Sequence, residues 1–303
     1  VLIAMGLAAF RAGYLIDVVA PVIGASVLFA GLLASTLAEA DQQRRLLREA
    51  QLRVAGELEA ARRIQMGLLP APRELFAHER RFTLDAQLEP ARTVGGDFYD
   101  CFMLDEHRLF FLVGDVSGKG LAASLFMALS KSLLKSIALR GSGEPAEIVC
   151  AADAEIGRDN PESLFVTVFA AVLDTRTGHV RYCNAGHEPP VLCQPGEAPQ
   201  RLTEFAGPPL CVIADYPYES GELELRPGGW LCAVSDGVTE AMNPRYELYG
   251  AQRLIAALAA SASREPYAVL AAVREDVRRF AAEAEQSDDV TLVCVRWNGA
   301  SGR

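Results

Sequence analysis

The sequence has few of the side chains that bind zinc or form structural disulfides. Its four histidines lie singly along the chain, without the spacing of a zinc site. It has seven cysteines, and no two of them stand in a C-x-x-C pair. An odd number of cysteines without such pairs is typical of a reducing compartment. These absences argue against a zinc-stabilised domain and against a secreted, disulfide-stapled one.

Basic residues are also scarce. The chain carries 29 Lys and Arg against 39 Asp and Glu, which gives a formal net charge of −10. A nucleic-acid-binding domain needs clustered Lys and Arg to neutralise phosphates, so nucleic acid is not a predicted partner. The 303 residues suffice for two average domains, or for one large domain with a leader.

One long apolar run stands out near the N-terminus. It extends from Leu15 to Leu37 and contains one charge, Asp17, and one proline, Pro21. About 20 apolar residues cross a bilayer as a helix, so we expect a transmembrane helix at residues 14–38. A buried core helix and a signal peptide are the alternatives, and neither suits the helical segment that follows. Arginines come next, and such an excess marks the cytoplasmic side of a cell (inner) membrane: Arg44, Arg45, Arg48 and Arg53.

The first residues are apolar as well. Residues 1–12 are predicted to be the end of a preceding transmembrane span, because Val1 to Phe10 is apolar and Arg11 follows it. A sequence that opens within a span indicates an upstream sensor region that is missing from it.

Residues 39–69 are predicted to form a signalling helix with a coiled-coil seam. The segment lacks proline until Pro70, and Leu47, Val54, Ala61 and Leu68 recur every seven residues. This pattern predicts a homodimer through residues 39–69. An amphipathic helix lying on its own catalytic domain is the alternative, because the apolar stripe is narrow. Pro70 then ends the helix.

Residues 70–298 alternate short β-type runs with helical patterns, which predicts an α+β domain, followed by a tail at residues 299–303. Turn signals such as the one ending in Gly178 favour antiparallel pairing. The expected strands are Arg81 to Leu88, Phe98 to Leu104, Leu109 to Val116, Phe165 to Leu173, Val180 to Asn184, Trp230 to Val234 and Val290 to Arg296. The expected helices are Leu121 to Leu139, Pro145 to Arg158, Gln252 to Ala260 and Tyr267 to Ala284.

Aspartates stand beside glycine or serine at four places, and three of the four follow strand-like runs. A single aspartate at a turn usually has a structural role, but four such sites favour a cluster. Clustered carboxylates repel one another unless cations neutralise them, and oxygen ligands without His or Cys suit Mg²⁺ or Mn²⁺. Two such ions would activate water for phosphate-ester hydrolysis. The aspartates are Asp97, Asp115, Asp236 and the pair Asp288-Asp289.

A set of short motifs resembles the metal-dependent protein phosphatases (the PPM or type 2C superfamily), in particular their SpoIIE-like bacterial branch. The motifs occur in that family's order and cover most of the chain. They are Ala61-Arg62-Arg63-Ile64-Gln65 with Leu68-Leu69-Pro70, Val94-Gly95-Gly96-Asp97-Phe98-Tyr99-Asp100, Gly114-Asp115-Val116-Ser117-Gly118-Lys119-Gly120, Asn184-Ala185-Gly186-His187, Ser235-Asp236-Gly237-Val238-Thr239-Glu240-Ala241 and Asp288-Asp289-Val290-Thr291.

The resemblance implies two central antiparallel β-sheets flanked by helices, with two Mn²⁺ or Mg²⁺ ions between the sheets. It implies a serine/threonine phosphatase whose substrate is a phosphorylated regulator such as an anti-sigma-factor antagonist. By the family pattern, Arg92 would bind the substrate phosphate. The implied catalytic and metal-linked residues are Asp97, Asp115, Asp236 and Asp288, with the backbone carbonyl of Val116, and with Asp289 as the alternative to Asp288.

Some positions depart from the pattern or leave alternatives open. Ser117 stands where eukaryotic relatives carry a histidine proposed as general acid, so the proton donor is unassigned. His187, followed by two prolines, is interpreted as structural, and Asp100 is considered as a further metal ligand. A catalytically silent, membrane-tethered docking module is the alternative function. A nucleotide-binding loop at Gly114 to Lys119 is rejected, because only three residues separate its glycines.

Overall fold

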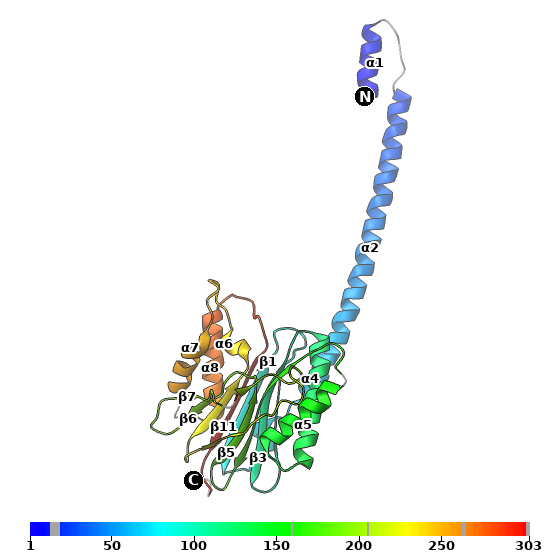
Figure 1. The fold of residues 1–303 in the computed structure, drawn as a ribbon. Coiled ribbons are helices and arrows are strands. Elements are labelled where there is room, and N and C mark those ends of the chain that lie inside the picture. The colour runs from blue at the N-terminus through cyan, green and yellow to red at the C-terminus, as the bar shows by residue number, and fades with distance from the viewer. Residues whose placement is uncertain (13–18, 159, 205, 262–264, 301–303) are drawn as a thin grey trace. The chain divides into compact units, whose positions relative to one another are not determined.

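The structure, a computed structural model, describes residues 1–300 except 13–18, 159, 205 and 262–264 (Figure 1). Residues 14–18 of the expected transmembrane helix and residues 301–303 of the expected tail therefore lie outside the described residues. The chain divides into two compact units, Val1–Glu57 and Leu58–Arg303. The second unit thus includes the last turns of the helix that precedes Pro70.

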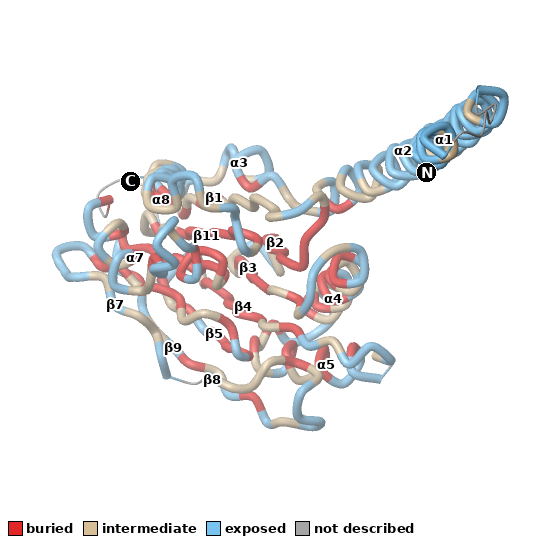
Figure 2. The backbone as a smooth tube through the Cα atoms, turned by 90° about the horizontal axis from the view of Figure 1, so that it is seen from above, coloured by how far each residue is buried: buried red, intermediate tan, exposed pale blue. Residues whose placement is uncertain are grey.

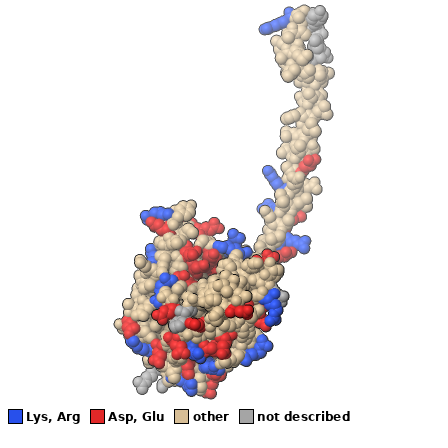
Figure 3. Space-filling model, viewed as in Figure 1, with Lys and Arg blue, Asp and Glu red and all other residues tan. Residues whose placement is uncertain are grey.

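The first unit is helical. It contains α1 (Leu2–Arg11) and the larger part of α2 (Val19–Leu68), as far as Glu57. The expected transmembrane and linker segments form one continuous helix, with Pro21 in its first turn, where a missing backbone N–H costs nothing. Over its most apolar 18-residue stretch, α2 has a mean hydropathy of 1.9, and none of this stretch is buried. Few charged side chains interrupt this part of the helix on the face seen in Figure 3. This part of α2 has the length and composition of a membrane-crossing helix.

The second unit contains two β-sheets. One sheet has the strand order β1 (Phe82–Glu89), β11 (Val290–Trp297), β10 (Trp230–Val234), β6 (Val191–Cys193) and β7 (Gln200–Arg201). The other has the order β2 (Phe98–Met103), β3 (Arg108–Val116), β4 (Val166–Asp174), β5 (His179–Ala185) and β8 (Ala206–Gly207), and β9 (Gly221–Glu224) also pairs with β5. All these pairings are antiparallel except that of β5 with β8.

Helices cover the outer face of each sheet. The helices α4 (Leu121–Arg140) and α5 (Pro145–Arg158) cover the β2–β3–β4–β5 sheet, and α7 (Gly250–Ala259) and α8 (Pro266–Ala281) cover the β10–β11 side of the other. The short helices α3 (Pro72–Leu75) and α6 (Asp236–Thr239) complete the unit. The predicted α+β class, two sheets flanked by helices, is confirmed.

Strand β3 shows why its sequence is apolar without alternation. Successive side chains of a strand point to opposite faces. Leu109, Phe111 and Val113 enter the core between the two sheets, whereas Phe110 and Leu112 enter the core under α4 and α5. Both faces are therefore buried, and Figure 2 shows this central strand as buried. Burying each such large apolar side chain contributes roughly 1.5–3 kcal/mol to folding.

Several details differ from the sequence-based expectations. Helix α8 ends at Ala281, three residues before the expected end, because Ala282 has a φ of 50° and leaves the helical path. Helix α4 agrees with its expected bounds to one residue. It has the length and composition of a membrane helix, but it packs on its sheet, and 39% of its most apolar 18-residue stretch is buried. The strands β6, β7, β8 and β9 were not expected. They are two to four residues long, which is too short for a periodic signal.

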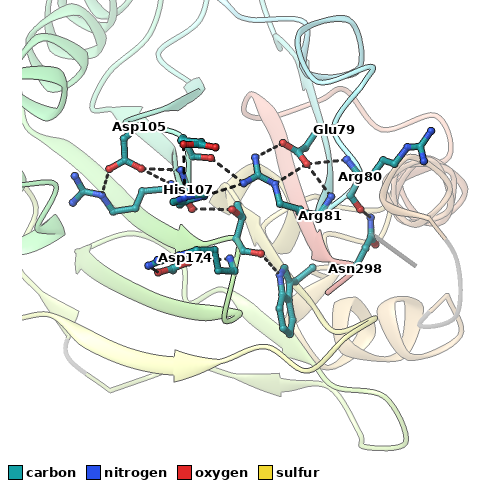
Figure 4. Close-up of polar contacts among 12 residues, drawn as sticks. Glu79, Arg80, Arg81, Asp105, His107, Asp174 and Asn298 are labelled. Carbon is teal, nitrogen blue, oxygen red and sulfur yellow. Dashed lines mark hydrogen bonds and ion pairs between the residues drawn. The ribbon is translucent and has the colours of Figure 1, made fainter. Parts of the chain in front are cut away.

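One end of the two sheets carries a network of neutralised charges (Figure 4). Arg81 binds Glu79 through Nη2 at 2.6 Å, and its Nη1 donates to the carbonyl of Glu106 at 2.9 Å. In the turn between β2 and β3, Arg108 Nε donates to Asp105 at 2.6 Å. The carboxylates of Glu79 and Asp105 thus each face an arginine. The opposite end of β2 and β3 has a different balance of charge.

Candidate active site

Asp97 and Asp115 lie at the end of β2 and β3 that is remote from this network. Pairing of Phe98 with Gly114 sets the two aspartates beside each other. By the two-residue period of a strand, Asp115 shares the face of Leu109 and Val113, which points between the sheets. Asp97 is 1% exposed, so its carboxylate is withdrawn from solvent.

The second sheet brings three further aspartates to the same edge. Strand β10 ends just before Ser235 and Asp236, and β11 begins just after Asp288 and Asp289. Because β10 and β11 run antiparallel, these ends are neighbours. Two contacts then join the sheets: Thr291 Oγ1 donates to Asp97 Oδ2 at 2.5 Å, and the Asp97 N–H donates to Asp289 Oδ2 at 3.3 Å.

The aspartates perturb one another strongly. Burial raises the pKa of Asp97 well above its usual value, and the charges of Asp115 and Asp289 raise it further. Burial and the charge of Asp236 raise the pKa of Asp115 to about 7. The pKa of Asp236 is raised by burial and by Asp288. Carboxylates with raised pKa values are short of positive charge, in contrast to the arginine-paired carboxylates at the other end of the sheets.

Two glycines allow the chain to pass close to these carboxylates. A Cβ atom on Gly95 would lie 1.7 Å from Asp289 Oδ2, and one on Gly96 would lie 2.6 Å from the carbonyl oxygen of Val116. Neither distance is possible for real atoms. The double glycine before Asp97 is therefore required by packing, and it brings the Val116 carbonyl to the carboxylate cluster.

The last turn of α2 also reaches this loop. Gln65 is 4% exposed, its Nε2 donates to the Gly95 carbonyl at 2.7 Å, and its Oε1 accepts from the Gly95 N–H at 3.2 Å. Both polar groups of Gly95 are thus satisfied by one side chain. The helix end is hydrogen-bonded to the residue two positions before Asp97.

Two cations lie at the rim of the cluster. Lys119 Nζ is 2.8 Å from Asp288 Oδ2 and donates to the Ser287 carbonyl at 2.6 Å. Arg92 is exposed and lines a shallow depression together with Lys119, Asp288 and Asp289. Lys119 is therefore held in place beside Asp288 and pairs with its carboxylate. Arg92 lines the same depression.

The donor set fits a hard divalent cation. It consists of carboxylates and one backbone carbonyl, the ligands that Mg²⁺ and Mn²⁺ prefer. The Lys119 ammonium already pairs with Asp288, at a position that a metal ion could otherwise occupy. Among the residues that the structure describes, no three Asp, Glu, His or Cys side chains converge closely enough to hold one ion between them. Such an ion would be held by one or two carboxylates with water completing its shell, as Mg²⁺ commonly is.

Comparison with known proteins agrees with this arrangement. The family model for stage II sporulation protein E (SpoIIE) matches residues 105–298, which is more than half of the chain. This chain belongs to the SpoIIE family. It is therefore a SpoIIE-like member of the PPM phosphatase superfamily.

Individual relatives share about 30% of their residues with this chain or fewer. Protein IcfG of Synechocystis is 31% identical over 80% of this chain and 42% of its own length. The phosphoserine phosphatase RsbU of Bacillus subtilis is 27% identical over 84% of this chain and 74% of its own length. The chain thus spans less than half of IcfG.

The fold has counterparts among solved structures. The PP2C domain of SiaA from Pseudomonas aeruginosa superposes with a TM-score of 0.72 at 24% identity, over 82% of this chain and 98% of that domain. Two other structures of the same fold, with TM-scores of 0.51 and 0.54, contain two manganese ions and magnesium, respectively.

The structure corrects one expectation for this SpoIIE-family site. Asp100 was considered as a further metal ligand, but it accepts a 2.6 Å hydrogen bond from Lys131 Nζ on α4. Asp100 lies three residues after Asp97, so the strand period turns it to the opposite face of β2. It points to the helix layer, away from Asp97 and Asp115.

His187 has the structural role expected of it. The His187 side chain is buried, and its Nδ1 lies 2.8 Å from Thr167 Oγ1. The backbone N–H of His187 donates to Asn184 Oδ1 at 2.8 Å. Burial lowers the pKa of His187 to about 4, so the ring is neutral at pH 7 and has no proton to deliver as an imidazolium. Ser117 is also engaged, because its Oγ accepts from the Phe165 N–H at 2.9 Å.

Three contacts of the SpoIIE-family site were not anticipated: those of Gln65, Lys119 and Thr291. All three residues lie within the matching motifs, so the motifs marked them without giving a role. Lys119 was otherwise considered only for a nucleotide loop. Its contact with Asp288 joins residues far apart in the sequence, and no local pattern predicts such a contact.

Proposed function

We propose that this protein is a metal-dependent serine/threonine phosphatase of a bacterial signalling pathway. The observation that supports this most is the gathering of Asp97, Asp115, Asp236 and the pair 288–289 at one edge of the two sheets, where burial and neighbouring carboxylates raise the pKa values of Asp97, Asp115 and Asp236. A cluster that is short of positive charge binds divalent cations, and phosphoryl transfer depends on such cations.

The proposed roles follow from the positions of the side chains. Asp97, Asp115, Asp236 and Asp288 would hold two Mn²⁺ or Mg²⁺ ions, together with the Val116 carbonyl, and Asp289 is the alternative to Asp288. When bound, the ions would supply the charge that acidifies water and stabilises phosphoryl oxygens. Thr291 orients the Asp97 carboxylate through its hydroxyl. Arg92, at the rim, would bind the substrate phosphate through its guanidinium fork.

The proposed substrate is phosphoserine or phosphothreonine on a regulatory protein. A relative that matches most of this chain is named a phosphoserine phosphatase, which supports this class of substrate. By the family resemblance, the regulator would be an anti-sigma-factor antagonist. A catalytically silent docking module is disfavoured, because a docking surface gains nothing from buried, mutually repelling carboxylates.

The activity is tested with the full chain in detergent micelles. We expect hydrolysis of p-nitrophenyl phosphate and of a phosphoserine peptide with Mn²⁺ or Mg²⁺, and no hydrolysis with EDTA. Asp115→Asn should lower kcat by at least about 100-fold. The matched control is Asp105→Asn, a surface aspartate in the turn at the far end of β3. Turnover that persists in EDTA, or in Asp115→Asn, contradicts the proposal.

We also propose that residues 14–38 anchor the protein in the cell membrane with the catalytic unit in the cytoplasm, and that residues 39–69 form a homodimer. The exposed apolar surface of α2 and the arginines that follow it support the anchor. The exposure of Leu47 and Val54, one heptad apart, supports the dimer. Cysteine crosslinking at position 47 in isolated membranes tests both proposals. Protein found in the soluble fraction contradicts the membrane anchor. The lack of a crosslinked dimer contradicts the homodimer.

A further inference from the structure

A cavity of about 310 Å³ adjoins the carboxylate cluster on the side of α8. Its walls come from α8, from α6 and the chain after it, from the loop 284–287 and from the ends of β1 and β11. The volume is at the lower end of the range of about 300–1,000 Å³ found for ligand pockets. It is sufficient for a few amino-acid side chains.

The cavity and the carboxylates are built on the same stretches of backbone. Gly237, which lines the cavity, directly follows Asp236, and Ser287, which also lines it, directly precedes Asp288. An extended polypeptide advances about 3.3–3.6 Å per residue. A residue only a few positions from a phosphoserine held at the carboxylates can therefore reach the cavity.

The lining of the cavity is mainly apolar. Small and apolar side chains form it, and Met242 is 37% exposed although no function of the carboxylates uses it. Exposed apolar surface in a concave site commonly marks a binding position. The apolar lining residues are Ala241, Met242, Val277, Ala281 and Val290.

The rim of the cavity is polar and ordered. Arg278 Nη2 binds both carboxylate oxygens of Glu89 at 2.8 and 2.9 Å. Gln286 Nε2 donates to the carbonyls of Glu89 at 3.0 Å and of Asp288 at 2.8 Å. These contacts tie the wall of the cavity to the backbone of Asp288. The walls are held in place before any ligand arrives, which lowers the entropic cost of binding.

One cation at the rim remains available. Arg274 faces the cavity, and among the described residues it makes no ion pair or hydrogen bond, whereas Arg278 is engaged by Glu89. A carboxylate of a bound chain would complement the guanidinium of Arg274. Glu285 in the loop 284–287 is an acidic residue that also lines the cavity, so the charges favour an acidic residue in the ligand only on the α8 side, at Arg274.

We infer that this cavity is a docking pocket for the substrate polypeptide, and that it binds an apolar side chain within about three residues of the phosphoserine, with an acidic neighbour at Arg274. The inference rests on the proposed phosphatase function, because the phosphoserine at the carboxylates sets the distance to the pocket. The pocket would give the enzyme a preference among phosphoproteins that the carboxylates alone do not supply.

The test compares two substitutions on α8 in the full-length protein. Ala281→Trp fills the pocket, and Ala271→Trp places the same side chain on an exposed position of the same helix. The substrates are two phosphoserine nonapeptides, one with Leu two residues and Glu three residues on either side of the phosphoserine, the other with Gly and Gln there. For each protein, kcat/KM for each peptide is divided by that for p-nitrophenyl phosphate.

We expect wild type and Ala271→Trp to prefer the Leu/Glu peptide about tenfold, as burial of one leucine side chain allows. Ala281→Trp should lose most of this preference, and Arg274→Gln should lose the part that depends on Glu. No preference in the wild type, or a preference unchanged in Ala281→Trp, overturns the docking pocket and leaves the phosphatase function standing. Altered dimer mass in Ala281→Trp with unchanged peptide preference assigns the cavity to a second copy of the chain and also overturns it.

A binding measurement keeps the two proposals separate. Fluorescence anisotropy of the labelled Leu/Glu peptide is measured with Asp115→Asn, alone and combined with Ala281→Trp. Weaker peptide binding in the combined variant supports the pocket. This holds even if the wild type does not hydrolyse p-nitrophenyl phosphate, because that lack of hydrolysis overturns only the phosphatase function. Equal binding overturns the pocket.

Discussion

Gln65 and Gly95 are joined by a pair of hydrogen bonds in which one side-chain amide satisfies both the N–H and the carbonyl of the same residue. Gly95 in turn packs on the Asp289 carboxylate so closely that no side chain fits there. The end of α2 is thus linked to the carboxylate cluster through a single loop residue. A shift of this helix end must move Gly95 or break both hydrogen bonds.

Replacing Gln65 tests this link. Gln65→Ala leaves the N–H and carbonyl of Gly95 buried without partners, which costs roughly 1–3 kcal/mol of folding free energy. Because the loop carries Asp97, we expect Mn²⁺ affinity to fall about tenfold, as when other supports of metal ligands are removed. Isothermal titration with Mn²⁺ measures this. Gln51→Ala, at an exposed position of α2, is the control, and equal affinity in the two variants contradicts the link.

Lys119 provides a second test of the cluster. Its ammonium neutralises Asp288, so a divalent cation that uses Asp288 must compete with it. We expect Lys119→Met to bind Mn²⁺ about fivefold more tightly, the effect of one partly solvent-screened charge. Arg245→Met, which removes an exposed charge elsewhere, is the control for net charge. Weaker binding in Lys119→Met would show instead that Lys119 holds Asp288 in position.

The Asp100–Lys131 pair predicts a loss of stability without a loss of metal binding. Both residues are buried, and Asp100→Asn leaves the Lys131 ammonium without a full counter-charge. Removing one partner of a buried ion pair costs about 3–5 kcal/mol, although Lys131 retains an amide oxygen here. Urea unfolding measures the loss, and Asp105→Asn, in an exposed pair, should lose less than about 1 kcal/mol.

The same variant separates Asp100 from the metal site. Because Asp100 points to the helix layer, the folded fraction of Asp100→Asn should bind Mn²⁺ like the wild type. A clear loss of Mn²⁺ affinity in the folded protein would make Asp100 a ligand after all. Asp100→Leu combined with Lys131→Met should recover most of the lost stability, since apolar replacements of a buried pair are well tolerated.

His187 predicts a pH dependence. Its pKa is lowered by burial from 6.5 to about 4, so the unfolded state binds a proton at a higher pH than the folded state does. The neutral ring contributes its full stability above about pH 6.5 and progressively less as pH falls towards 4, by at most about 3 kcal/mol. Urea unfolding of wild type and His187→Asn between pH 4 and 7 measures the difference. A constant difference across this range contradicts the prediction.

The sequence determined the architecture and most of the candidate site. Continuous apolar runs such as Leu109 to Val113 specify strands buried on both faces, and the heptad and arginine patterns specify the helix before Pro70. Glycine beside aspartate marked Asp97, Asp115 and Asp236, because such turns bring a carboxylate to a strand end. The structure brings these residues together, as that pattern predicted.

Tertiary structure decided which neighbouring side chains serve the cluster. Asp97 and Asp100 both follow the double glycine, but only the pairing of β2 shows that one points between the sheets and the other to Lys131. The contacts of Lys119 with Asp288, and of Gln65 with Gly95, join residues far apart in the sequence. Local propensity and periodicity carry no information about such contacts, because they arise only when the two sheets and the helix end pack together.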